Sequence, residues 1–218
     1  MDATTERPTR LIWIGVGLLA IILALAFWAM QFQQPPAATL PVLGQIENFS
    51  LTNQLGQAVT LANLRGKVWL ADIIFTRCPG PCARMTRQMA SVQSALPKDS
   101  AAQLVSLTTD PGYDTPAILQ AYPARLKLEA YPARWQFLTG TKTEIANLGI
   151  NSLKLAAVDK APAERTEADD LFIHATIFVL VDKQARLRGI YQTDGEVVTW
   201  ADVQPAILAA VKQLENER

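Results

Sequence analysis

The sequence predicts an α/β domain, because segments with the pattern of strands alternate along it with segments that have the pattern of helices. Val68–Phe75 and Leu171–Val181 are apolar, β-branched runs of strand length. The segment after the first run places Met85, Met89 and Val92 at helical spacing. This alternation is typical of βαβ units, so we expect a largely parallel sheet with helices on both faces.

Shorter signals complete the set of expected elements. Two strand-like pieces on either side of Gly56 indicate a β-hairpin. Thr115 and Pro116 are typical of a helix start, and Thr141 with Glu144 forms a capping-box pattern at another. The expected segments are the hairpin strands Phe49–Thr52 and Ala58–Leu61, the strands Gln103–Thr109, Trp135–Leu138 and Leu187–Tyr191, the helix Trp200–Leu214 and a polar, acidic loop at 160–170.

The charge balance argues against a nucleic-acid surface and against a disordered acidic tail. The chain of 218 residues has 20 lysines and arginines against 20 aspartates and glutamates, so its formal net charge is zero. A nucleic-acid surface needs concentrated positive charge that displaces counterions. A disordered acidic tail needs a block of like charge. We therefore expect no nucleic-acid partner.

Leu11–Met30 is an uninterrupted run of twenty apolar residues. As a helix it would be about 30 Å long, which matches the hydrocarbon core of a bilayer. Trp13 and Trp28 near its ends suit the membrane interface. The alternative is a cleaved signal peptide, whose apolar region is normally about 7–15 residues and ends in a small-residue site. We favour a retained single-pass transmembrane helix, because this run is longer and ends in bulky residues.

The positive charges around this run predict its orientation. Arg7 and Arg10 precede it, and the next basic residue is Arg65. The positive-inside rule thus puts the N-terminus in the cytoplasm and the rest of the chain across the membrane. No mitochondrial transit peptide is visible. We therefore expect a bacterial inner-membrane protein whose globular part faces the periplasm, a compartment that permits cysteine redox chemistry.

The expected organisation has four parts: a cytoplasmic N-terminus at 1–10, a transmembrane anchor at 11–32, a proline-rich linker at 33–45 and a globular domain at 46–218. The linker contains three prolines and no charge. It is either a semi-extended spacer or a disordered tether without a functional length.

Two cysteines, Cys78 and Cys82, follow the first predicted strand. Pro81 suits the first position of a helix, so we expect Cys82 in the first turn and Cys78 on the loop before it. The helix start, with Arg77 and Arg84, is expected to lower both thiol pKa values and favour thiolate. Thiolate both binds soft metals and exchanges disulfides. The alternatives are a structural disulfide, which would constrain the unfolded chain little across so small a loop, or two unreactive thiols.

His174 is the single histidine and lies in the second apolar run. It is either a hydrogen-bonded core residue or, because burial favours neutral imidazole, a metal ligand. Two thiolates and one imidazole suit Cu(I), whereas structural zinc would need a carboxylate as fourth ligand. Asp110, at the end of the neighbouring strand, is the candidate for a supporting or fourth group. Its alternative role is in the turn before Pro111.

Four motifs occur in a specific order along the chain. They are Phe75–Cys82 (FTRCPGPC), Asp110–Pro116 (DPGYDTP), Trp135–Gly140 (WQFLTG) and His174–Asp182 (HATIFVLVD). This order resembles the Sco/SenC family of membrane-anchored copper proteins, over most of the chain beyond residue 46. The resemblance implies a thioredoxin-like fold, with a central mixed sheet flanked by helices, together with the expected N-terminal β-hairpin.

The resemblance also implies a function. Cys78, Cys82 and His174 would bind copper as Cu(I) or Cu(II). The protein would deliver copper to the binuclear copper site of cytochrome c oxidase, or reduce cysteines there. Its partners would be the copper-bearing subunit of that oxidase and other periplasmic thiol-redox or copper proteins.

The chain departs from the family pattern in two places. Ala83 stands where family members often have proline. The pentapeptide Ala-Tyr-Pro-Ala-Arg occurs at both 121–125 and 130–134, a local duplication whose period is too short for a solenoid. Neither departure touches a proposed ligand, so both bear on the client protein rather than on metal binding.

Other functions could use the same thiols. Cys78 and Cys82 would form a redox-active pair in a metal-independent thiol–disulfide oxidoreductase, although C-x-x-x-C differs from the C-x-x-C typical of thioredoxin-like reductants. A peroxidase is disfavoured, because Phe75 and Pro79 stand where peroxiredoxins have threonine. A redox-sensing module is a third class. We predict a metallochaperone rather than an enzyme.

Overall fold

The structure is a computed structural model that describes residues 6–32, 39–78, 80–128, 134–155, 176–195 and 198–217. The chain divides into two compact units, Met1–Thr39 and Leu40–Arg218. The first unit contains the helix α1 (Glu6–Phe32), whose described side chains are exposed. In the part of the chain that the structure describes, no helix is both long and apolar enough to cross a bilayer.

The second unit is built on one sheet of eight described strands. These are β1 (Gly44–Gln45), β2 (Ser50–Asn53), β3 (Ala58–Thr60), β4 (Trp69–Ile74), β5 (Gln103–Thr108), β6 (Trp135–Thr139), β7 (Ile177–Val181) and β8 (Arg186–Gln192). Their order across the sheet is β1-β8-β7-β4-β5-β6-β2-β3. Only β4–β5 and β5–β6 among the described pairs are parallel. The expectation of a largely parallel sheet is therefore wrong, and the sheet is mixed, as the family resemblance implies.

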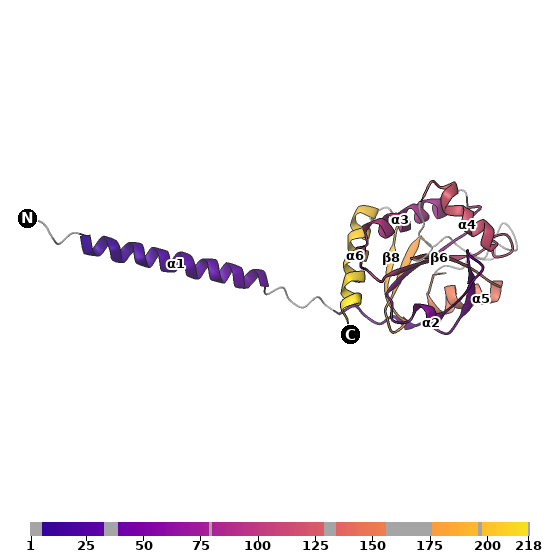
Figure 1. The fold of residues 1–218 in the computed structure, drawn as a ribbon, viewed down its shortest axis with the longest axis horizontal. Coiled ribbons are helices and arrows are strands. Elements are labelled where there is room, and N and C mark those ends of the chain that lie inside the picture. Colours follow the sequence, from indigo (N-terminus) through magenta and orange to yellow (C-terminus); the bar gives the residue numbers. More distant parts are fainter. Residues whose placement is uncertain are drawn as a thin grey trace, which may run out of the picture. The chain divides into compact units, whose positions relative to one another are not determined.

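Helices cover both faces of this sheet. They are α2 (Leu61–Leu64), α3 (Pro81–Ala95), α4 (Pro116–Arg125), α5 (Lys142–Ala146), the π-helix η1 (Asn147–Ser152) and α6 (Trp200–Asn216). Figure 1 shows α3, α4 and α6 on one side of the sheet and α2 and α5 on the other. Side chains alternate along β4, so Leu70 and Ile74 pack toward α3 and α6 while Trp69 and Ala71 pack toward the other face.

The helix starts that the sequence predicts are confirmed. The Thr115 hydroxyl accepts from the Ile118 N–H at 3.4 Å, and Pro116 is the first residue of α4. In the capping box of α5, the Glu144 N–H donates to Thr141 Oγ1 at 3.2 Å and the Thr141 N–H donates to Glu144 Oε2 at 2.8 Å. These side chains satisfy backbone groups that a helix end leaves without partners.

Two strand boundaries differ from expectation. Leu61, expected to end the hairpin, begins α2 instead, because the Thr60 N–H donates to the Asn63 side chain at 2.8 Å and starts a helical turn. The last two residues of the predicted linker form β1, which pairs with β8. The hairpin itself is confirmed, with β2 antiparallel to β3 and Gly56 at a φ of +74° in the turn.

Several predicted segments lie partly or wholly outside the described residues. The second apolar run is described only from Thr176, and β7 starts at Ile177. The acidic loop at 160–170 is outside. The first copy of the repeated pentapeptide forms the end of α4, and only Arg134 of the second copy is described.

Candidate metal centre

The two cysteines lie where β4 ends and α3 begins. Pro81 is the first residue of α3, so Cys82 falls in its first turn and Cys78 on the preceding loop, as predicted. This is the carboxyl edge of the parallel strands β4 and β5. Ligands of open α/β sheets bind outside this edge, because loops and helix starts converge there.

The loop brings the sulfur of Cys78 against the start of α3. The Cys82 N–H points to Cys78 Sγ at 3.4 Å, and the Cys78 N–H donates to the Phe75 carbonyl at 3.1 Å, which closes a tight turn. Both thiols are free. Cys78 is half-buried, whereas Cys82 is 3% exposed. Two adjoining soft sulfur donors, one of them accessible, fit the ligand preference of Cu(I).

The prediction that the helix start lowers the pKa of Cys82 is wrong. Burial raises the pKa of this thiol, and its contact with Cys78 raises it further. A backbone hydrogen bond opposes these effects more weakly. Burial thus favours the neutral thiol of Cys82 over its thiolate.

The two arginines expected to act on the thiols are engaged by carboxylates. Arg77 Nη2 lies 2.5 Å from Asp110 Oδ2, and Arg84 forms an ion pair with Asp194. The Arg77 guanidinium also lies 4.1 Å from the ring centroid of Tyr113. The positive charge that sequence reasoning assigned to the cysteines is thus largely compensated nearby.

Asp110 takes the turn role that was the alternative to metal binding. Its carbonyl accepts the N–H groups of Tyr113 and Asp114 at 3.0 and 2.8 Å, and its own N–H donates to Thr108 Oγ1 at 3.0 Å. Within the described ranges, no three histidine, cysteine, aspartate or glutamate side chains gather as a metal site. Asp110 therefore does not join the two cysteines there.

Asp114 is a site residue that sequence reasoning missed. It is fully buried, and its carboxylate accepts from the Thr76 N–H at 3.1 Å and from the Thr76 and Thr108 hydroxyls at 2.5 Å each. Thr76 lies two residues before Cys78. The sequence signal that could have identified Asp114 is its place directly before the Thr115 N-cap, in a segment that follows a buried strand.

Asp72 is the second missed residue. It lies in β4, is fully buried, and within the described part of the chain neither carboxylate oxygen has a hydrogen-bond partner. Burial raises its pKa to about 7, and Ser106, directly opposite on β5, lowers it less. Asp72 in turn acts electrostatically on Cys82 and Tyr122, which pack on the same face. The sequence signal that could have identified Asp72 is a single acidic residue within an otherwise apolar strand.

His174 lies outside the described residues, so the three-ligand set stays a prediction. The described chain resumes at Thr176 and enters β7, which is antiparallel to β4 and therefore begins at the edge where β4 ends. The Thr176 carbonyl accepts the Thr193 N–H at 2.7 Å, and the Thr193 carbonyl accepts from the Gln88 side chain of α3 at 3.1 Å. The start of β7 is thus tied to the helix that carries Cys82.

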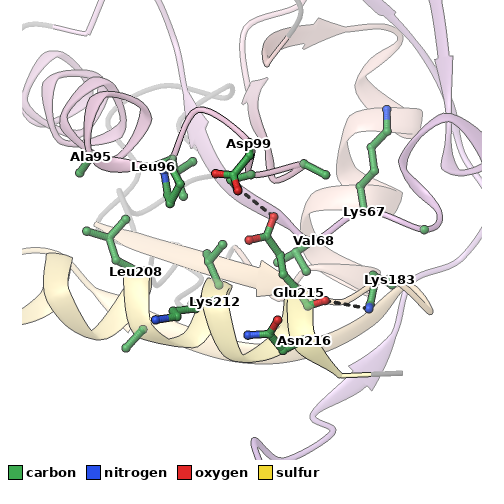
Figure 2. Close-up of a pocket in the computed structure, with 16 residues that line it drawn as sticks. Lys67, Val68, Ala95, Leu96, Asp99, Lys183, Leu208, Lys212, Glu215 and Asn216 are labelled. Carbon is green, nitrogen blue, oxygen red and sulfur yellow. Dashed lines mark hydrogen bonds between the residues drawn. The ribbon is translucent and has the colours of Figure 1, made fainter.

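A cavity of about 730 Å³ lies at the opposite edge of the sheet, beside the start of β4 and the ends of α3 and α6 (Figure 2). Its walls combine Val68, Leu96 and Leu208 with Lys67 and Lys212. No residue predicted for the metal centre lines it. The cavity is therefore separate from the cysteine site.

Comparison with known proteins agrees with this geometry. Residues 42–207 match the SCO1/SenC family model. The SCO1 protein homolog of Bacillus subtilis is 35% identical over 149 residues, which are 67% of this chain and 73% of that protein.

Two solved structures have the same fold. BsSco, a member of the Sco family of cytochrome c oxidase assembly proteins, is 30% identical with a TM-score of 0.65 over 83% of this chain and 99% of its own. Bradyrhizobium japonicum ScoI with copper bound is 26% identical with a TM-score of 0.60 over 78% of this chain and 99% of its own. From the family model, the relatives and the fold together, this chain belongs to the SCO1/SenC family.

Proposed function

We propose that this protein is a copper-binding metallochaperone that helps to assemble the binuclear copper site of cytochrome c oxidase. The observation that carries the proposal is the pair of free thiols at the carboxyl edge of β4, where the Cys82 N–H meets Cys78 Sγ at 3.4 Å. Soft sulfur ligands select copper in its reduced state. Membership of the family, and the copper bound by B. japonicum ScoI, support the same metal.

His174 would supply the third ligand in this proposal. It precedes Thr176 by two residues, and Thr176 is linked through Thr193 to α3, the helix of Cys82. A neutral imidazole beside two thiolates would also let the site hold Cu(II), because imidazole suits that ion as well.

The different exposure of the two thiols suggests how copper would be handed over. Cys78 is half-buried and reachable by a ligand of the client protein, while Cys82 is buried. A client thiolate would replace Cys78 first, with Cys82 holding the ion during the exchange. Because copper binds the thiolate form, loading copper would displace a proton from any ligand thiol that still carries one.

A copper titration of the full chain in detergent, against a competing Cu(I) chelator, tests this proposal. We expect about one copper per chain, and a loss of more than about a hundredfold in affinity for Cys78→Ser and for Cys82→Ser, since removing even an outer-shell partner costs about 10–100-fold. Ser94→Ala on the same helix is the matched control and should bind like wild type. In cells, both cysteine variants should yield oxidase deficient in copper; wild-type affinity in either one contradicts the proposal.

A metal-independent thiol–disulfide oxidoreductase is the second candidate, and it is favoured by two free cysteines in which the Cys82 N–H meets Cys78 Sγ. In that reaction the dithiol gives two electrons to a disulfide of the oxidase, which leaves as two thiols while Cys78 and Cys82 become a disulfide. Reduction of an oxidised oxidase peptide at the same rate by wild type and His174→Ala supports this candidate. A rate that depends on His174 and on copper argues against it.

We also propose that the apolar run Leu11–Met30 anchors the chain in the bacterial inner membrane, with the second unit in the periplasm. The charge pattern of Arg7 and Arg10 supports this orientation. Reporter fusions at the C-terminus should be active only when the reporter works in the periplasm. A C-terminus in the cytoplasm contradicts this topology.

A further inference from the structure

The buried carboxylate of Asp114 holds the loop that carries Cys78. Asp114 lies after β5, and its carboxylate receives the Thr76 N–H at 3.1 Å and the Thr76 hydroxyl at 2.5 Å. Thr76 is itself only 4% exposed. Opening this contact would leave buried polar atoms without partners, which is costly, so the contact resists opening.

The position of the Cys78 sulfur depends on this contact more than that of Cys82 does. Cys82 belongs to α3, whose side chains Met85 and Met89 are embedded in the core. Cys78 sits on a short turn closed by its own N–H to the Phe75 carbonyl. Fixing Thr76, which lies inside that turn, therefore fixes where the turn lies relative to the helix.

The loop of Cys78 is also linked through Arg77 to the turn that contains Asp110 and Tyr113. Arg77 forms an ion pair with Asp110 and lies over the Tyr113 ring, but its side chain is 56% exposed. Solvent and salt screen such a pair, and exposed pairs contribute little to holding a conformation. The contact of Thr76 with Asp114 is buried, so it is expected to hold the loop more firmly than the exposed contacts of Arg77 do.

We propose that Asp114 is a positioning residue, which acts through Thr76 to hold Cys78 in the place where its sulfur and that of Cys82 can share one metal ion or one disulfide. This inference rests on the proposed function of the cysteine pair. It assigns the motif Asp110–Pro116 a role in which Asp114, rather than Asp110, serves the site.

The equilibrium of the cysteine pair with glutathione tests the proposal without copper. In it, Cys78 and Cys82 are oxidised to a disulfide while one oxidised glutathione is reduced to two thiols, so the equilibrium constant measures how well the sulfurs are placed. The full chain in detergent is the protein for this measurement. Thr76→Val, which loses the hydroxyl donor, and Asp114→Asn should each lower the constant roughly tenfold.

Two further variants separate positioning from a general structural role. Thr76→Ser keeps the hydroxyl and should retain the wild-type constant within about twofold. Thr108→Val removes the other hydroxyl donor to Asp114 but leaves Thr76 bonded. It should lose stability, measured by urea unfolding, while its glutathione equilibrium stays within about twofold of wild type.

Each outcome decides the question. A lowered constant in Thr76→Val with a normal one in Thr76→Ser and Thr108→Val supports the proposal, even if Asp114→Asn fails to fold. An unchanged constant in Thr76→Val, an equal loss in Thr108→Val, or no disulfide in wild type overturns it. Copper titration of the same proteins is read separately: a wild type that forms the disulfide but binds no copper refutes the proposed function and leaves the positioning role intact.

Discussion

Two buried aspartates on the cysteine side of the sheet differ in their surroundings. The carboxylate of Asp114 accepts three hydrogen bonds, whereas that of Asp72, within the described residues, has no hydrogen-bond partner. Burial disfavours the charged form of Asp72, whose pKa is raised to about 7. Asp114 has a structural role instead, because its carboxyl group links Thr76 in the cysteine loop to Thr108 at the end of β5.

Asp72 should make the protein less stable as the pH rises. Its folded-state pKa is raised to about 7 from an ordinary value of 3.8, so the folded state keeps a proton that the unfolded state releases. By linkage, stability contributed by this proton is fully present below about pH 4 and is lost as the pH rises through about 7. Compared with Asp72→Asn, wild type should lose roughly 2–4 kcal/mol of unfolding free energy between pH 4 and pH 8.

Urea unfolding of both proteins across this pH range measures the effect. The exposed substitution Asp99→Asn is the control and should follow the wild-type profile. Parallel pH profiles for wild type and Asp72→Asn would show that Asp72 is ionised in the folded protein, against this prediction.

At the scale of elements, Arg188 on β8 joins parts of the domain that lie far apart in the sequence. It is 4% exposed and lies 2.8 Å from both Asp182, in the turn after β7, and Glu217, at the end of α6. It also donates to the carbonyl of Leu40 at 2.7 Å, where the second unit begins. The buried guanidinium thus holds the first residue of the second unit and the end of α6 against β8.

Loss of this guanidinium should destabilise the protein strongly. Arg188→Ala removes the buried guanidinium that pairs with both Asp182 and Glu217, and breaking a buried pair costs about 3–5 kcal/mol. Arg186→Ala is the matched control, since Arg186 pairs with the same oxygen of Asp182 but is 35% exposed. It should cost about 1 kcal/mol or less. Denaturant midpoints measure both values, and equal losses would contradict the assignment.

At the scale of the whole molecule, local signals were enough to predict most elements. The strand composition of Val68–Phe75, the Thr115-Pro116 helix start and the Thr141–Glu144 capping box each act within a few residues, and each is found in the structure. Strand direction is different, because it depends on where the chain travels between strands. This is why β7 was not foreseen as antiparallel to β4, and why the two-residue β1, which has no periodicity, was missed.

At the cysteine site, too, local features could be predicted from the sequence and features that depend on tertiary packing could not. The spacing of Cys78, Pro81 and Cys82 predicts a loop and a helix start, and both are present. Asp110 and Asp114 lie in one turn, but Asp110 bonds the exposed Arg77 side chain and Asp114 is buried against Thr76, a difference that the sequence does not reveal. The raised pKa of Cys82 likewise follows from packing around α3, and the local charge pattern points the other way.

Copper binding by the full chain and by its His174→Ala variant is the most direct test of the proposed centre. A Cu(II) titration followed by absorption and electron paramagnetic resonance should give about one ion per chain for wild type. His174→Ala should bind more than about a hundredfold more weakly with an altered spectrum, while its urea unfolding stays unchanged. If the variant keeps the wild-type affinity and spectrum, His174 is no ligand and the three-residue copper centre is contradicted.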